Sequence, residues 1–80
     1  MLGVSLVKSW LACFGTKAEA LRELNKKLGR SYQHGHLSRW ERGLREPDRK
    51  ARHEMTTAVL ASEHPDWTPR RVAAFAEKLR

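Results

Sequence analysis

Several features that define other protein classes are scarce or missing in this sequence. A single cysteine among 80 residues excludes an internal disulfide, and the apolar run around Cys13 favours a buried, inert thiol. No run of about twenty apolar residues occurs, so neither a membrane span nor a signal peptide fits. Strand-like alternation, internal repeats and low-complexity tracts are also missing. We therefore expect an all-α protein that is soluble and cytoplasmic.

Acidic residues are also few. Nine Asp and Glu stand against sixteen Lys and Arg, which leaves a net charge of +7 and favours a polyanionic partner, either nucleic acid or an anionic surface. Eighty residues suffice for one domain, residues 1–80, with little room for a catalytic cleft. Neither a Gly-rich phosphate loop nor a nucleophile with a base at motif spacing is present. We expect no enzymatic activity, no cofactor and no small-molecule ligand.

Apolar periodicity and capping residues predict a compact bundle of about five helices. The first helix is ended by Gly15 in a left-handed conformation, and its apolar face holds Val4, Val7, Trp10, Leu11 and Phe14. Thr16 and Glu19 match a capping box, which starts a second helix from about Lys17 to Leu28. Its predicted buried stripe is Ala18, Leu21, Leu24 and Leu28.

The rest of the chain predicts three more helices around a shared core. A tight connection at Gly29, Arg30 and Ser31 leads to a third helix that ends near Arg42, with Leu37 and Trp40 facing inward and Gly43 closing it. An exposed loop, Leu44 to Asp48, precedes a fourth helix capped by Asp48, with inner residues Ala51, Met55, Ala58, Val59 and Ser62. Thr68 and Pro69 start the fifth, whose apolar stripe is Val72, Phe75, Ala76 and Leu79.

The third helix combines an apolar anchor with an outward polar face, as a helix in the major groove of DNA requires. The side chains expected to reach base edges are Gln33, His34, His36 and Arg39. Residues on and beside this helix are expected to grip phosphates whatever the base sequence: Arg30, Ser38, Arg42, Arg45, Arg49, Lys50 and Arg52. The pattern predicts a helix-turn-helix over roughly residues 16–42.

A resemblance to a known family supports this interpretation. The run Leu37–Pro47 reads LSRWERGLREP and, with Leu24–Gly29 upstream, resembles the end of the helix-turn-helix in the Cro and repressor family, the lambda-repressor-like or XRE-type regulators. The resemblance implies a helical bundle that binds operator DNA as a homodimer and represses phage, plasmid or bacterial genes. It also implies that Trp40 and Glu41 are structural and that Arg42 contacts the DNA backbone.

Two features depart from the family pattern, and Gly35 adds a further question because glycine inside a helix is destabilising. The spacing from Gly29 to Leu37 is two residues longer than usual, so either the turn is extended or the recognition helix begins earlier. Asn25 stands where the family has alanine, at the contact between the second and third helices, and its amide requires a partner if it is buried. Either the register is shifted or the two helices cross differently. Gly35 either marks the start of the third helix or lets the backbone approach DNA closely.

Other interpretations concern the last helix and the histidines. Residues 68–79 are expected to form a dimer surface, with Trp67, Val72, Phe75 and Leu79, or only to complete the core. A protein-interaction module, such as an antitoxin that binds a toxin and its own promoter, is the alternative function. RNA binding through Tyr32 is a weaker one. A metal site is not expected, since His34 and His36 lie two apart on a helix and point to nearly opposite sides.

Overall fold

The five predicted helices are present, and the all-helical fold class is confirmed. The computed structural model describes residues 2–78, and the burial of side chains from Ser5 onward. Within that range the chain forms helices and no strand. The helices are α1 (Leu2–Leu11), α2 (Lys17–Leu28), α3 (His34–Glu41), α4 (Arg49–Glu63) and α5 (Pro69–Lys78). None of the described helices is long and apolar enough to cross a membrane.

Short polar side chains begin three of the helices. Thr16 before α2, Asp48 before α4 and Thr68 before α5 each accept a backbone N–H from three residues further on, at 3.1, 3.0 and 3.2 Å respectively. Such a side chain satisfies one of the amides that the first helical turn leaves without a partner. The predicted bounds of α2 and the predicted cap at Asp48 are therefore confirmed.

Two of the helix ends use a glycine in the left-handed region. Gly29 ends α2 with φ 63° and Gly43 follows α3 with φ 73°, both as predicted. The prediction for Gly15 was wrong, because its φ is not positive. Helix α1 instead ends in tighter turns, in which the Cys13 N–H donates to the Trp10 carbonyl at 3.0 Å. Cys13 itself is half-buried rather than buried.

The main core lies where α1, α2, α3 and α4 meet. Its buried members are Val7, Trp10, Ala20, Leu21, Leu24, Leu37, Trp40, Ala51 and Met55, and the partly buried side chains around it include Phe14, Leu28 and Val59. The predicted burial of Ala18 was wrong, since Ala18 is exposed and Ala20 takes its place. At 3.6 residues per turn, Ala18 lies about 120° from the centre of the buried stripe. Val4 was also predicted to face the core, but its side chain lies outside the described ones.

A second, smaller core joins α5 to α4, so the prediction of one shared core was wrong. Leu60, Val72 and Ala76 are buried there, and Trp67 packs against them. Helix α5 contacts α4 and no other described helix. Leu60 turns toward α5, whereas Ser62, predicted to face inward, is exposed. The buried face of α4 thus changes along the helix, because its first half packs in the main core and its last residues pack against α5.

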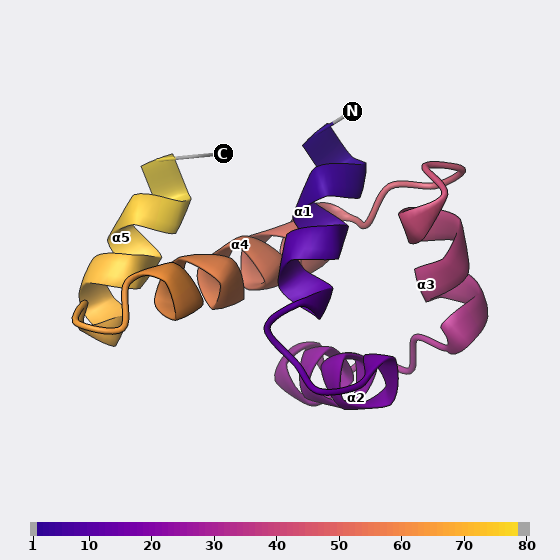
Figure 1. Ribbon diagram of the computed structural model, residues 1–80, viewed down its shortest axis with the longest axis horizontal. Coiled ribbons are helices and arrows are strands. Elements are labelled where there is room, and N and C mark those ends of the chain that lie inside the picture. Colours follow the sequence, from indigo (N-terminus) through magenta and orange to yellow (C-terminus); the bar gives the residue numbers. More distant parts are fainter. Residues whose placement is uncertain (1, 79–80) are drawn as a thin grey trace.

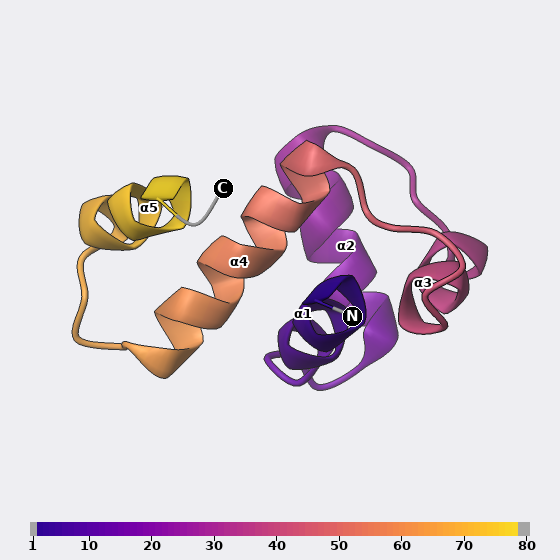
Figure 2. The same cartoon turned by 90° about the horizontal axis from the view of Figure 1, so that it is seen from above.

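The two cores give the molecule two ends. Figures 1 and 2 both place α3 at one end and α5 at the other, with α1, α2 and α4 between them. The overall dimensions are 33 × 24 × 21 Å. The face of α3 that points away from α1 and α2 is therefore open to a partner, and α5 does not cover it.

Candidate nucleic-acid interface

Helix α3 presents a continuous polar face to solvent and an apolar face to the core. Leu37 and Trp40 are 1% and 4% exposed and hold the helix against the bundle. The exposed positions recur one, three and four residues apart, which places them on one side of the helix. They are His34, Gly35, Ser38, Arg39 and Arg42. Gln33 and His36 are exposed at one edge of this face. The predicted base-contacting residues are thus all accessible to a partner.

The turn before α3 is extended, which is one of the two alternatives predicted from the long spacing between Gly29 and Leu37, and the extra residues have a defined support. The chain between Gly29 and Gln33 is not helical, so the tight connection expected at Gly29–Ser31 was too short. Asn25 holds this turn in place with its amide. Its Nδ2 donates to the Tyr32 carbonyl at 2.9 Å, and its Oδ1 accepts the Tyr32 N–H at 2.8 Å. Asn25 therefore has the partner it requires, and its departure from the family pattern accompanies the lengthened turn.

The ring of Tyr32 packs beneath the start of α3. It meets the Trp40 ring edge-on at 4.9 Å and the His36 ring at 5.4 Å between centroids. Edge-to-face contacts of this kind add to the stabilisation from burial. Tyr32 is half-buried in this cluster. It therefore joins the turn to the core, and its ring does not stand free as a platform on which an RNA base could stack.

A polar brace ties this turn to the start of α4. The Arg30 guanidinium donates to the Tyr32 hydroxyl and to the Asp48 carboxylate, and the Tyr32 hydroxyl donates to Asp48 Oδ2 at 2.7 Å. Pro47, next to Asp48, is buried, so the loop predicted to be exposed is partly enclosed. Arg30 was predicted to contact phosphate, but its guanidinium is occupied within the protein.

The brace shifts the pKa of each of its members. Burial would raise the pKa of Asp48, but hydrogen bonds from the Ala51 backbone, Tyr32 and Arg30 outweigh it, so this pKa lies below its ordinary value. Burial and the hydrogen bond to Asp48 raise the pKa of Tyr32. Hydrogen bonds to Tyr32 and Asp48 raise the pKa of Arg30. At neutral pH the brace therefore consists of a carboxylate, a phenol and a guanidinium.

His36 has a structural contact as well as an exposed edge. The Gln33 N–H, at the start of α3, donates to His36 Nδ1 at 3.1 Å, so the neutral imidazole carries its proton on Nε2. On this side of α3, a cleft of about 380 Å³ is lined by His36, Arg39, Trp40 and Arg45. The structure thus brings Arg45 beside two of the predicted base-contacting side chains.

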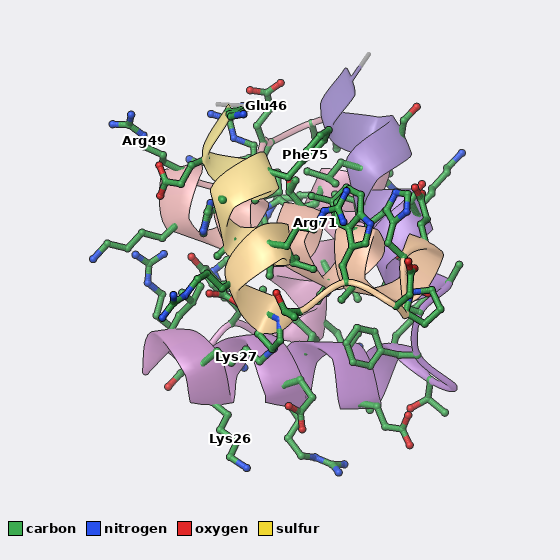
Figure 3. All side chains as sticks on the ribbon, turned by 90° about the vertical axis from the view of Figure 1, so that its left-hand side faces the viewer. Lys26, Lys27, Glu46, Arg49, Arg71 and Phe75 are labelled. Atoms are coloured by element: carbon green, nitrogen blue, oxygen red, sulfur yellow. The ribbon has the colours of Figure 1, made fainter. Side chains whose placement is uncertain are left out.

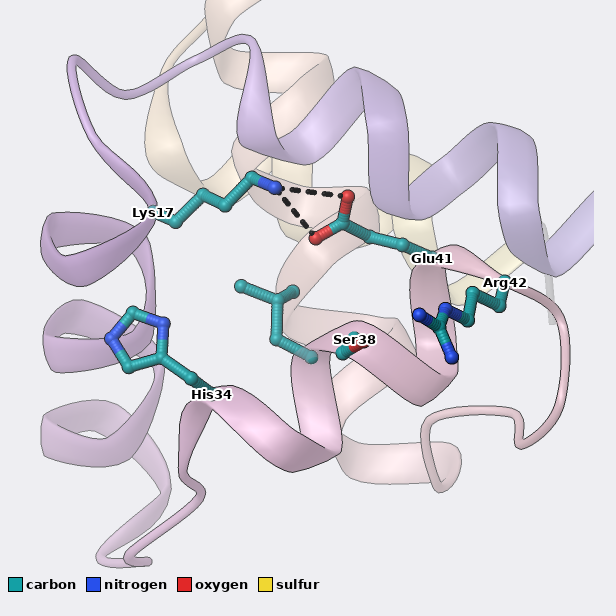
Figure 4. Close-up of a pocket in the computed structure, with 6 residues that line it drawn as sticks. Lys17, His34, Ser38, Glu41 and Arg42 are labelled. Atoms are coloured by element: carbon teal, nitrogen blue, oxygen red, sulfur yellow. Dashed lines mark hydrogen bonds and ion pairs between the residues drawn. The ribbon is translucent and has the colours of Figure 1, made fainter.

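A second cleft lies on the other side of α3, toward the start of α2. It has a volume of about 280 Å³ and is lined by Lys17, His34, Leu37, Ser38, Glu41 and Arg42. Lys17 Nζ lies 3.1 Å from Glu41 Oε1 and donates to Oε2 at 3.2 Å (Figure 4). Lys17 was not among the predicted site residues, because the two partners stand 24 residues apart and no local pattern pairs them.

The remaining predicted phosphate contacts lie further from α3. Arg49 and Lys50 are exposed at the start of α4, and the Arg49 side chain extends into solvent (Figure 3). Arg52 lies 4.0 Å from Glu46, a weak ion pair at the surface. None of these three lines either cleft beside α3. The positive charge near the exposed face of α3 therefore comes chiefly from Arg39, Arg42 and Arg45.

The residues predicted for a dimer surface divide between core and surface. Val72 is only 2% exposed within the second core, so it is not available to a partner, whereas Phe75 is 42% exposed. Trp67 is half-buried, stacked on His64 at 3.9 Å between ring centroids, with the Arg71 guanidinium 4.5 Å from its ring centre. Figure 3 shows Arg71 and Phe75 on α5. Leu79 lies outside the described residues.

Comparisons with protein-family models, with curated proteins and with solved structures found no match to this chain. Within residues 2–78, no group of three or more His, Cys, Asp or Glu side chains could hold a metal ion. What bears on function in this chain is therefore the geometry of α3 and the charge around it.

Proposed function

We propose that this chain is a sequence-specific DNA-binding regulator that places α3 in the major groove of operator DNA. The observation that carries the proposal is the two-sided character of α3. Its exposed side bears Arg39 and Arg42, while Leu37 and Trp40 anchor the opposite side in the core. A helix that reads DNA needs this combination, because rigid support on one side is what fixes the reading side chains in the groove.

Contacts with base edges and contacts with phosphates would come from different residues. Arg39, on the exposed face beside His36 and Arg45, would read a guanine through its O6 and N7, a contact worth about 1 to 3 kcal/mol of discrimination. Gln33, His34 and His36 would lie near base edges on the first turn. Ser38, Arg42 and Arg45 would hold the phosphates on either side. Phosphate contacts supply affinity without sequence preference.

The test begins with selection of duplexes from a randomised library by the full chain. Fluorescence anisotropy then compares the selected duplex with a scrambled one at two salt concentrations. We expect at least a thousand-fold preference for the selected duplex, within the range typical of specific binding. Binding that is equal for all duplexes and lost at moderate salt would contradict the proposal, because it would reflect charge alone.

Two arginine variants distinguish recognition of bases from binding of phosphates. Arg39→Ala should remove the preference between duplexes. Arg45→Ala should weaken binding to all duplexes alike and reduce the salt dependence. Both side chains are exposed and line the same cleft, so each variant is a matched control for the other. Equal loss of preference in both variants would contradict the division of roles.

A homodimer through α5 is part of the proposal, since paired half-sites require two reading helices. Phe75 is a large apolar side chain left exposed beside Trp67, at the end of the molecule opposite α3. The same observation also favours the second candidate, an antitoxin-like module whose α5 binds another protein. Light scattering of the chain with and without a two-fold duplex decides between them. A dimer that Phe75→Ser abolishes supports the first, and a monomer in both states favours the second.

A further inference from the structure

Gly35 has no evident structural reason to be a glycine. It lies in the first turn of α3, on the exposed face, and its φ is not in the left-handed region. A Cβ built at this position would meet only Arg39 Nη2, at 3.7 Å, which is an ordinary van der Waals contact with the end of a flexible side chain. Alanine would therefore fit, and it would favour the helix more than glycine does.

The two left-handed glycines provide a contrast. Gly29 and Gly43 stand at helix ends with positive φ, where a side chain would be strained. Gly35 meets no such requirement, and no core residue packs on it. Its neighbours on the same face, His34, Ser38 and Arg39, all carry exposed polar side chains. What distinguishes the position is that the first turn of α3 carries no side chain there, and only the end of the Arg39 side chain lies near the place of a Cβ.

We propose that Gly35 is the point of closest approach between α3 and duplex DNA, where base edges in the major groove meet the helix backbone directly. This close approach brings Arg39, one turn further on, within hydrogen-bonding distance of a guanine. The proposal rests on the proposed function. A methyl group at Gly35 would hold the helix away by about the length of a carbon–carbon bond, and a hydrogen bond stretched that far beyond its usual 2.7–3.2 Å is lost.

The first experiment compares Gly35→Ala with Gly15→Ala in the full chain. Gly15 is exposed, has no positive φ, and a Cβ there would lie 3.4 Å from the flexible Glu19 carboxylate, so it receives the same chemical change away from α3. Anisotropy with the duplex selected by the wild-type chain measures affinity. We expect Gly35→Ala to bind at least ten-fold more weakly and Gly15→Ala to bind within two-fold of wild type.

Thermal unfolding followed by circular dichroism accompanies the binding assay. We expect Gly35→Ala to melt at or above the wild-type temperature, which makes its loss of affinity a loss of contact. Affinity within two-fold of wild type would overturn the proposal. A lower melting temperature would also overturn it, because Gly35 would then serve the fold. If the wild-type chain prefers no duplex at all, the proposed function fails instead, so the two failures are distinguishable.

A second experiment tests the link to Arg39. Each guanine of the selected duplex is replaced in turn by 7-deazaguanine, which lacks the N7 acceptor. At one position the substitution should weaken wild-type binding about ten-fold and leave Gly35→Ala and Arg39→Ala unaffected, since both variants have already lost that hydrogen bond. If Gly35→Ala stays as sensitive as wild type at every position, Gly35 does not control the reach of Arg39 and the proposal is overturned.

Discussion

Replacement of Asp48 should destabilise the protein more than any other single surface substitution near α3. One carboxylate accepts the Ala51 N–H as the cap of α4, accepts the Tyr32 hydroxyl, and pairs with Arg30. It therefore connects the α2–α3 turn with α4, although it is exposed at the surface. Asp48→Ala removes all of these contacts at once.

The expected cost follows from the separate contacts. Loss of a helix cap costs about 1 kcal/mol, with a range of roughly 0.5 to 2. Loss of the hydrogen bond from Tyr32 costs roughly 0.5 to 1.5 kcal/mol. The pair with Arg30 is exposed and screened by solvent, so it is left out of the sum. Together they give about 1 to 3.5 kcal/mol, or a decrease in Tm of roughly 4 to 28 °C for a domain of this size.

Urea unfolding followed by tryptophan fluorescence measures this free energy. Asp48→Asn is the matched control, because asparagine caps a helix about as well as aspartate. We expect it to retain the cap and to lose about half as much stability as Asp48→Ala. A loss below about 0.5 kcal/mol for Asp48→Ala, the level of an ordinary surface substitution, would refute the assignment of Asp48 as a joint between the two segments.

Asp48 should also make the free energy of unfolding depend on pH. The pKa of Asp48 is lower in the folded chain than its ordinary value of 3.8, so the unfolded chain binds more protons between the two values and stability rises with pH there. The stability that ionised Asp48 gives to the folded chain is fully present above its ordinary pKa. It is lost as the pH falls through the lower pKa of the folded chain. The difference in stability between wild type and Asp48→Asn should therefore shrink below about pH 4. A difference independent of pH would contradict this.

Three further outcomes are expected from denaturant unfolding. Asn25→Ala should cost about 1 to 3 kcal/mol, since two backbone groups of Tyr32 lose their partners; a cost no greater than that of Lys26→Ala would contradict this. Val72→Ala removes a buried side chain and should cost roughly 1 to 3 kcal/mol. Phe75→Ala should cost less, because the Phe75 ring is 42% exposed. A greater cost for Phe75→Ala would contradict the burial of Val72, and not Phe75, between α4 and α5. Glu41→Gln should cost less than about 1 kcal/mol and match wild type at high salt, and a difference that persists in salt would indicate a buried pair.

Much of the fold was predictable because its signals are local. The caps at Thr16 and Asp48 and the left-handed ends at Gly29 and Gly43 depend on neighbours within a few residues along the chain. The face of α3 follows from its spacing of apolar residues in the same way. Gly15 shows the limit of this reasoning, because α1 ended in tighter turns without the left-handed conformation that a glycine permits.

The sequence by itself determined where the helices lie and which side of α3 is polar, since helix periodicity and capping act over one or two turns. Only the tertiary structure decided how that helix is held. The lengthened turn depends on the amide of Asn25, and the brace joins Arg30 to Asp48. Lys17 at the start of α2 pairs with Glu41 at the end of α3. These contacts join segments whose separation in space is set by the packing of whole helices, and no local pattern encodes that distance.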